Sequence, residues 1–287
     1  MNSSESKNTF VPRQAIAPTP ELYDELVADG MENLAKATLA QFPPITSGAV
    51  VHDNGCGTGA GTSALMALLS DRADKLSIKG TDINEQALAV YREQAAKKAW
   101  PAEGIHMDSA ALSFPDDTFT HSIGNALLFV LPDDGAGALR ETYRTLRPGG
   151  LAAVNSWAYV PNMEPVRAAS RATRPGGTPV PRQGLDRWAR TEHLRGLVRE
   201  SGFEKDKIRE VQADVHVTTS EVTRYAAMLW SFIGGTGPTG WLESDEENWD
   251  RAVEIVKEQL RKTEGYKEID GGKLQLKFIA NIVIAMK

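Results

Sequence analysis

An apolar strand followed at once by glycines at every second position constrains this chain more than any other feature. Residues 50–61 read Val-Val-His-Asp-Asn-Gly-Cys-Gly-Thr-Gly-Ala-Gly, and an apolar helix face begins at Ala64. A tight turn between a buried strand and a helix start is how open α/β sheets build nucleotide sites at the carboxyl ends of their strands. Glycine suits such a turn because it reaches backbone angles closed to other residues and lets a ligand approach bare backbone. The segment therefore predicts a loop that binds a nucleoside-bearing cofactor.

The acid before the glycines helps to choose between two cofactors. Residues 55–60 also satisfy the loose G-x-G-x-x-G/A pattern of NAD enzymes. Asp53 lies two residues before the first glycine. At the mouth of the loop its carboxylate would repel a pyrophosphate but would favour a ligand that carries an ammonium and a sulfonium. This favours S-adenosylmethionine (SAM). An NAD-dependent oxidoreductase stays as the weaker alternative, because the chain contains no Tyr-x-x-x-Lys.

Further acids and turn phrases follow in a recognisable order. Asp82 and Asp108 each come at the end of a predicted strand, and the phrases Phe-Pro-Asp-Asp-Thr-Phe (114–119) and Leu-Arg-Pro-Gly-Gly (146–150) come after them. Together with the glycine loop, these residues resemble the motifs of the class I SAM-dependent methyltransferases over about residues 45–160. The chain departs from that pattern at Thr120, where the family commonly carries an acid.

The resemblance implies SAM as the cofactor, S-adenosylhomocysteine as the product, and a set of residues that bind them. In the family, an acid at the end of the second strand accepts hydrogen bonds from the ribose hydroxyls, and an acid or amide after the third strand meets the adenine. Carried over to this sequence, the implied cofactor-binding residues are Asp53, Gly55, Cys56, Gly57, Asp82, Ile83, Asp108, Ser109 and Asn125. Cys56 is interpreted as a small residue that packs near the cofactor.

The alternation of strand and helix patterns predicts a Rossmann-like, doubly wound α/β fold. The resemblance implies a seven-stranded, mainly parallel sheet whose last strand is antiparallel, with a helical cap inserted. The expected strands are Val50–Asp53, Leu76–Thr81, Gly104–Met107, His121–Ala126, Leu151–Ser156, Ile208–Val217 and Leu274–Met286. The expected helices are Glu21–Phe42, Asn84–Trp100, Thr191–Ser201 with Thr191 as a good N-cap, Ser220–Phe232 and Ser244–Lys262.

These elements divide the chain into six expected segments. They are an N-terminal arm and lid helix (1–44), the SAM-binding core (45–160), a proline-rich irregular loop (161–184), a continuation of the core (185–218), a helical cap (219–268) and the final core strand (269–287). The arginines of the proline-rich loop are interpreted as ordinary solvated charges, with contact to an acidic substrate as the alternative; they are Arg167, Arg171, Arg174 and Arg182.

The expected acceptor is a small molecule, with O-methylation favoured and S- or N-methylation as alternatives. The core with its cap resembles the natural-product tailoring methyltransferases of fungi and bacteria, which implies a secondary metabolite as the acceptor. Aromatic side chains suit a planar or apolar ligand. The candidate acceptor-binding residues are Tyr23, Trp157, Met228, Trp230 and Phe232. A SAM-binding protein of the same fold without methyl transfer, cyclase-like or regulatory, is the main alternative.

Catalytic and metal-binding candidates are few. His216, at the carboxyl end of the sixth predicted strand, is the best candidate for a general base. No H-E-x-x-H or cysteine–histidine metal spacing occurs, and no aspartate pairs with Asn125, so a metal-independent reaction is expected.

Composition argues against two classes of partner. The 287 residues carry a formal net charge of −6 and a sequence pI near 5.5, so a broad nucleic-acid-binding surface is not expected. No apolar stretch reaches roughly 18 residues, which argues against a membrane span. The polar segment Asn2–Asn8 does not read as a secretory signal. Cys56 is the single cysteine, which suits a reducing compartment, and we expect a cytoplasmic protein.

Overall fold

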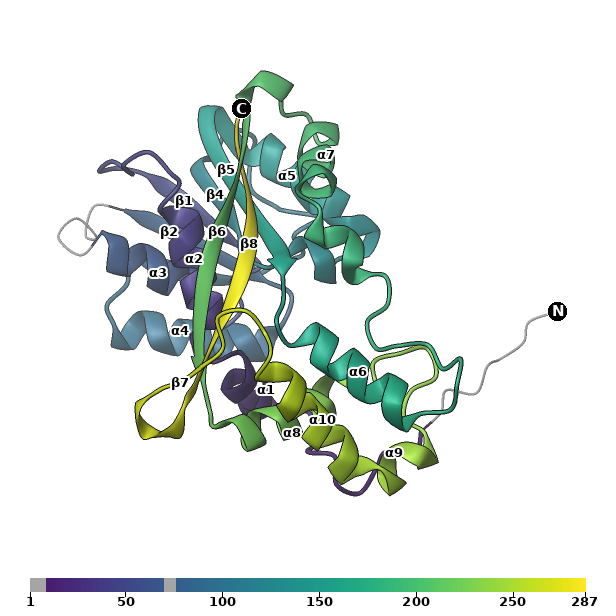
Figure 1. The fold of residues 1–287 in the computed structure, drawn as a ribbon. Helices are drawn as coiled ribbons and strands as arrows, with labels where there is room; N and C mark the ends of the chain where they lie inside the picture. The colour runs from purple at the N-terminus through teal and green to yellow at the C-terminus, as the bar shows by residue number, and fades with distance from the viewer. Residues whose placement is uncertain (1–8, 70–75) are drawn as a thin grey trace. The chain divides into compact units, whose positions relative to one another are not determined.

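The structure is a computed structural model that describes residues 9–69 and 76–287 (Figure 1). The chain divides into two compact units. The described residues of the first, here called the helical unit, fall within Met1–Gly30, Val160–Asp186 and His216–Phe278. Those of the second, the sheet unit, fall within Met31–Tyr159, Arg187–Val215 and Ile279–Lys287. The segment Asn2–Asn8 lies outside the described residues.

The strands form one mixed sheet in the order β3-β2-β1-β4-β5-β8-β6, with β7 paired to β8. Strands β1 to β5 pair in parallel, and β8 pairs antiparallel to β5 in a register that sets Leu151 opposite Met286. The predicted Rossmann-like sheet with an antiparallel last strand is confirmed, and the two-residue β7 is an addition to it. The strands are β1 Val50–Asn54, β2 Ser77–Asp82, β3 Ala102–His106, β4 Phe119–Gly124, β5 Leu146–Tyr159, β6 Ile208–Thr219, β7 Lys267–Glu268 and β8 Leu274–Met286.

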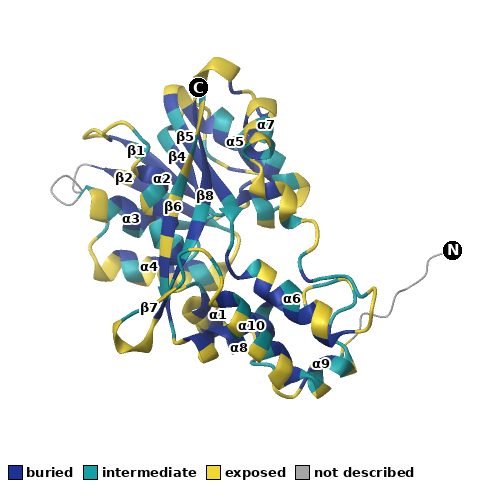
Figure 2. Cartoon of the chain, in the orientation of Figure 1, coloured by how far each residue is buried: buried dark blue, intermediate teal, exposed yellow. Residues whose placement is uncertain are grey.

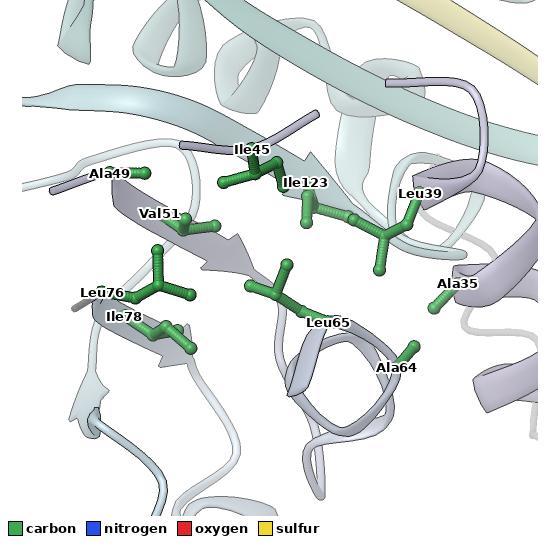
Figure 3. Close-up of a cluster of buried hydrophobic side chains, with 10 residues drawn as sticks. All are labelled: Ala35, Leu39, Ile45, Ala49, Val51, Ala64, Leu65, Leu76, Ile78 and Ile123. Carbon is green, nitrogen blue, oxygen red and sulfur yellow. The ribbon is translucent and has the colours of Figure 1, made fainter. Parts of the chain in front are cut away.

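Helices of the sheet unit pack against this sheet through apolar side chains. The helices are α2 Gly30–Leu39, α3 Ala60–Leu68, α4 Glu85–Lys97, α5 Ala136–Thr145 and α7 Thr191–Glu200. Leu39 of α2 and Leu65 of α3 meet Val51 of β1 in one buried cluster (Figure 3). Burial of such side chains stabilises the fold by roughly 1.5–3 kcal/mol each. Figure 2 shows the central strands as largely buried. The cluster holds β1 in the interior, and the glycine loop follows directly from this buried strand.

The helical unit has its own interior. Its helices are α1 Pro20–Val27, α6 Met163–Thr173, α8 Val222–Ile233, α9 Glu243–Glu247 and α10 Trp249–Leu260. Trp230 of α8 is fully buried and lies edge-on to Trp241, with ring centroids 5.7 Å apart. Arg174, which follows α6, and Asp245 of α9 form an ion pair at 2.8 Å in which both side chains are fully buried. Short 3-10 helices occur in both units, at Leu128–Val130, Pro132–Gly135, Leu185–Ala189, Lys205–Lys207 and Asp270–Gly272. None of the described helices has the length and apolar character needed to span a membrane.

Three predicted elements differ from the structure. The single helix expected over Glu21–Phe42 is two helices, because Ala28 has a φ of 44° and its amide closes the first helix onto the Asp24 carbonyl. The proline-rich segment expected as an irregular loop contains helix α6. Pro165 lies in the first turn of α6, where a missing amide hydrogen breaks no helical bond. The helix expected over Ser244–Lys262 is broken into α9 and α10 at Asn248.

Two details of the sheet unit also differ. Strand β4 ends at Gly124 instead of Ala126, because Ala126 has a φ of 55°, outside the range of a strand. Thr191 does not cap α7: it is the first helical residue, and its hydroxyl donates to Asn281 Oδ1 at 2.6 Å. Asn84 does cap α4, since its Oδ1 accepts from the Gln86 amide at 3.0 Å.

Candidate cofactor site

The carboxyl ends of three parallel strands bring the predicted loop and acids together. The register sets Asn54 of β1 opposite Thr81 of β2, and Asp82 of β2 opposite His106 of β3. The glycine loop, Asp82 and Asp108 therefore begin at one edge of the sheet. Adjacent parallel strands with turns at that edge are where open α/β sheets bind nucleosides.

The glycines of the loop meet different constraints. A Cβ at Gly55 would lie 2.4 Å from Leu127 Cδ1, so Leu127 would have to shift, and the φ of 69° at Gly55 would strain any residue with a side chain. Gly57 has a φ of 52°, and a Cβ on it would meet no atom of the described structure within 4 Å. The backbone at Gly57 therefore faces open space, which is the arrangement required where a ligand approaches bare main chain.

Asp82 ties the glycine loop to the end of β2. Its Oδ2 accepts a hydrogen bond from the Gly57 amide at 2.8 Å, and its Oδ1 accepts from the Asn84 amide at 2.8 Å. Each carboxylate oxygen retains a second lone pair, so the partly buried group can also accept from a diol. The next residue, Ile83, leaves 64% of its surface exposed. A nucleoside would match this pair, because its ribose hydroxyls can donate to the acid and its adenine can pack on the apolar side chain.

Asp53 is buried and its carboxylate is bonded to the start of α3, whereas we expected its charge at the mouth of the loop. Its Oδ2 accepts from both the amide and the hydroxyl of Thr62, at 2.8 and 2.7 Å. Thr62 lies in the first turn of α3, so the side chain of Asp53 satisfies one of the free amides at the start of that helix. Gly61 permits the approach, because a Cβ there would lie 2.7 Å from Asp53 Oδ1. The role seen for the carboxyl is to hold the loop-to-helix turn.

Burial raises the pKa of Asp53 to about 6, and this predicts a pH dependence of stability. In the unfolded chain the carboxyl ionises near its ordinary value of 3.8. Between these two pH values the folded protein holds a proton that the unfolded chain has lost. The free energy of unfolding contributed by this group should therefore fall by about 2–3 kcal/mol as pH rises from about 4 to 6. Urea denaturation across that range should show a difference in slope between the native protein and Asp53→Asn. The exposed Asp206→Asn is the control, and parallel profiles for all three would contradict the assignment.

Cys56 anchors the glycine loop to the interior of the sheet unit. Its amide donates to the Thr81 carbonyl at 2.9 Å, and its side chain packs in a buried cluster with Leu88 and Tyr91. Burial raises the pKa of the thiol, so it stays protonated. The side chain is packed in the interior, and its position near the cofactor stays a prediction.

The edge at β3 and β4 is built from polar residues of several elements. Asp108 is exposed and its Oδ1 accepts from the Ala110 amide at 2.8 Å, while Ser109 is buried. Asn125 donates to the Met31 carbonyl at 3.0 Å and accepts from Asn155 Nδ2 at 2.9 Å. Asn125 thus connects the end of β4 to α2 and β5.

Asn155 is a site residue that sequence reasoning missed. It is fully buried in β5, its Oδ1 accepts from the Ala126 amide at 2.7 Å, and its Nδ2 donates to the Thr38 hydroxyl at 2.8 Å. The signal available in the sequence was a single amide inside an apolar strand, Ala152-Ala153-Val154-Asn155. A buried amide of this kind must find hydrogen-bond partners, and here the partners shape the end of β4.

The candidate acceptor residues do not form one group. Met228 and Trp230 are fully buried and contribute to the interior of the helical unit. Tyr23 and Phe232, in the same unit, are more exposed and their ring centroids are 5.7 Å apart. Trp157 is partly buried in β5 of the sheet unit.

The histidines were also assessed for a catalytic role. His216 is exposed on β6, between the buried Val215 and Val217. His52 is fully buried, with Nε2 2.9 Å from the Thr81 hydroxyl, and burial lowers its pKa to about 3, so it is neutral. His193 lies with Nε2 3.1 Å from Asp134 and packs edge-on to Trp188. Within residues 9–69 and 76–287, no three His, Cys, Asp or Glu side chains gather closely enough to hold a metal ion.

Comparison with known proteins agrees with this geometry. Residues 51–150 match the family described as "Methyltransferase domain". The chain is 29% identical over 196 residues to methyltransferase tpcH of Aspergillus fumigatus, a match that covers 64% of this chain and 67% of that protein. It is 37% identical over 93 residues to demethylmenaquinone methyltransferase of Thermus thermophilus, which covers 32% of this chain and 41% of that protein.

The fold also matches a solved structure. The YcgJ protein from Bacillus subtilis superimposes with a TM-score of 0.53 at 16% identity, covering 88% of this chain and 97% of the other. At that identity the likeness concerns the fold alone. Motif order, strand order and the match at residues 51–150 agree, and these residues form a methyltransferase domain similar to those of the class I SAM-dependent methyltransferases.

Proposed function

We propose that this protein transfers a methyl group from SAM to a small-molecule acceptor. The observation that carries the proposal is the open main chain at Gly57, joined by hydrogen bond to the carboxylate of Asp82. A side chain at Gly57 would project into the space that a nucleoside cofactor needs. Asp82 would accept from the ribose hydroxyls, Ile83 would cover one face of the adenine, and Asp108 with the Ser109 amide would bind the edge of that ring.

The residues of the site contribute mainly by positioning. SAM supplies a methyl group on a sulfonium, whose displacement releases a neutral thioether. Gly55, Gly57 and Asp82 would fix the cofactor, and the Asn125–Asn155 pair would keep the end of β4 in place beside it. Holding two reactants in line can contribute roughly 7–11 kcal/mol to lowering a barrier. His216 is exposed on β6, so we propose that catalysis rests on positioning more than on this histidine.

A small-molecule acceptor is supported by two observations. One relative is named a demethylmenaquinone methyltransferase, and the quinone ring of such a molecule is planar. The partly exposed rings of Tyr23 and Phe232 offer the aromatic surface that such ligands favour. We propose an oxygen acceptor first, with sulfur and nitrogen as the alternatives.

Calorimetry followed by mass spectrometry tests the proposal. The purified protein is titrated with SAM, S-adenosylhomocysteine and NADH, and then incubated with SAM and a panel of phenols, thiols and amines. Micromolar binding of both adenosyl ligands and a one-methyl mass gain on an acceptor are expected. Adenosyl binding without mass gain on any class of acceptor would favour the alternative of a SAM-binding protein that transfers no methyl group. Binding of NADH alone would favour an oxidoreductase.

Gly57→Ala gives a sharper test of the open main chain at Gly57 as the cofactor-binding surface. Alanine at a φ of 52° is strained by about 1–2 kcal/mol, and its methyl group would enter the open space. We expect SAM affinity to fall by about tenfold or more. Gly48→Ala is the matched control, since Gly48 has a φ of 82° and equally open surroundings but lies before β1. Both variants should lose similar stability in thermal unfolding, and only Gly57→Ala should lose affinity. Equal affinity for SAM in the two variants would count against cofactor binding at Gly57.

A further inference from the structure

One tyrosine of the sheet unit, Tyr91 of α4, lies against the backbone of three neighbouring elements, and its side chain is fully buried. A Cβ on Gly80 of β2 would lie 2.6 Å from the ring atom Cζ, and a Cβ on Gly104 of β3 would lie 2.9 Å from Cδ1. A Cβ on Gly59 of the glycine loop would lie 3.2 Å from Cδ2. Glycine inside a strand marks a place where another group approaches the backbone closely. At both strand positions that group is the ring of Tyr91.

The hydroxyl of Tyr91 begins a short chain of hydrogen bonds that leads to Asp53. Its oxygen lies 2.9 Å from Thr62 Oγ1, and Thr62 Oγ1 donates to Asp53 Oδ2 at 2.7 Å. The Thr62 amide donates to the same carboxylate oxygen at 2.8 Å. All three residues are buried, with Asp53 the most exposed at 2%. The chain of bonds therefore joins α4 to α3 and to the end of β1, the two elements between which the glycine loop runs.

The direction of these hydrogen bonds follows from the donors that are available. A threonine hydroxyl has one hydrogen, and Thr62 uses it on Asp53. Above its pKa of about 6, the Asp53 carboxylate can only accept. Burial raises the pKa of the Tyr91 hydroxyl, so Tyr91 keeps its hydrogen and donates it to Thr62. A hydroxyl that accepts one hydrogen bond becomes a stronger donor in the next. Tyr91 thus strengthens the bond by which Thr62 holds Asp53.

We propose that Tyr91 is a positioning residue for the cofactor, which acts through Thr62 and Asp53 on the turn between β1 and α3. That turn contains Gly57, whose open main chain is the proposed surface for SAM, so this inference rests on the proposed function. Without the Tyr91 hydroxyl, the bonds between Thr62 and Asp53 are weaker and the turn is less well ordered. A turn that adopts its binding geometry in about a tenth of the molecules would bind SAM about tenfold more weakly.

Tyr91→Phe tests the hydroxyl alone, because the ring and its contacts with the three glycines remain. Calorimetry with S-adenosylhomocysteine at about pH 8, where Asp53 is ionised, should show an affinity about tenfold below that of the native protein. Thr62→Val should lose at least as much. Thr62→Ser restores a hydroxyl at the same position and should bind with near-native affinity.

Tyr225→Phe is the matched control. It removes another buried tyrosine hydroxyl, which accepts from Asn162 Nδ2 at 3.2 Å in the interior of the helical unit. Thermal unfolding should show a similar loss of stability in Tyr91→Phe and Tyr225→Phe, and only Tyr91→Phe should lose affinity for S-adenosylhomocysteine. Equal affinity in these two variants would mean that the Tyr91 hydroxyl has a structural role alone.

The double variant Tyr91→Phe/Thr62→Val shows whether the two hydroxyls act as one chain. If Tyr91 acts through Thr62, the double variant should bind S-adenosylhomocysteine as weakly as Thr62→Val and no more weakly. Native affinity in Tyr91→Phe, or a loss that adds in full to that of Thr62→Val, would overturn the inference while leaving the proposed function intact. A native protein that does not bind S-adenosylhomocysteine would contradict the proposed function, and with it the inference that rests on it.

Discussion

Asp82→Ala is expected to weaken SAM binding by at least about a hundredfold. Both ribose hydroxyls would lose the carboxylate that accepts their hydrogen bonds, and each bond to a charged acceptor contributes about 1.5–3 kcal/mol. Their sum of about 3–6 kcal/mol corresponds to roughly 10²- to 10⁴-fold in the dissociation constant. The same change releases the Gly57 and Asn84 amides, so the loop that faces the cofactor would also lose its anchor. Calorimetric titration with SAM measures the loss.

Two further variants separate the direct contact from the anchoring. Asp82→Asn keeps one acceptor oxygen for an amide but loses the charge, so its affinity should fall between the native and alanine values. Asp206→Ala removes an exposed acid of the same unit and should leave affinity unchanged. An Asp82→Ala protein that binds SAM within tenfold of the native affinity would show that the acid at the end of β2 does not hold the cofactor.

The position of Asp82 could be predicted from the sequence, whereas the direction of the Asp53 side chain could not. Alternating strands and helices place the carboxyl ends of parallel strands at one edge, so any acid that ends such a strand lies near the loop. Asp53 is the last residue but one of β1, and its carboxylate accepts hydrogen bonds from Thr62 of α3, nine residues further along the chain. That choice depends on where α3 begins and on the room left by Gly61. Neither follows from the spacing of the motif.

The helical unit was the harder part to predict, for a related reason. Prolines and glycines over 161–184 suggested an irregular loop, yet α6 forms because its buried face, including Val166 and Ala169, packs into an interior made by residues some 60 or more positions away. Arg174 illustrates the same limit. Interpreted as a solvated charge, it is in fact fully buried against Asp245, 71 residues further along the chain. Local composition predicts that an arginine is exposed, and the burial of Arg174 depends on a partner distant in the sequence.

The Arg174–Asp245 pair carries the second large prediction, because Arg174→Met should lower the free energy of unfolding by about 3–5 kcal/mol. Methionine fills a similar volume, but it leaves Asp245 as a buried charge and strips a donor from the Gly234 carbonyl. The double variant Arg174→Met/Asp245→Leu should recover much of that loss, since it removes both charges together.

Arg171→Met is the matched control on the preceding helix, where the exposed pair with Glu164 should contribute less than about 1 kcal/mol. Denaturant unfolding followed by tryptophan fluorescence reports the effect, because Trp230, Trp241 and Trp249 all lie in this unit. If Arg174→Met and Arg171→Met cost the same, the buried pair would not be what stabilises the helical unit.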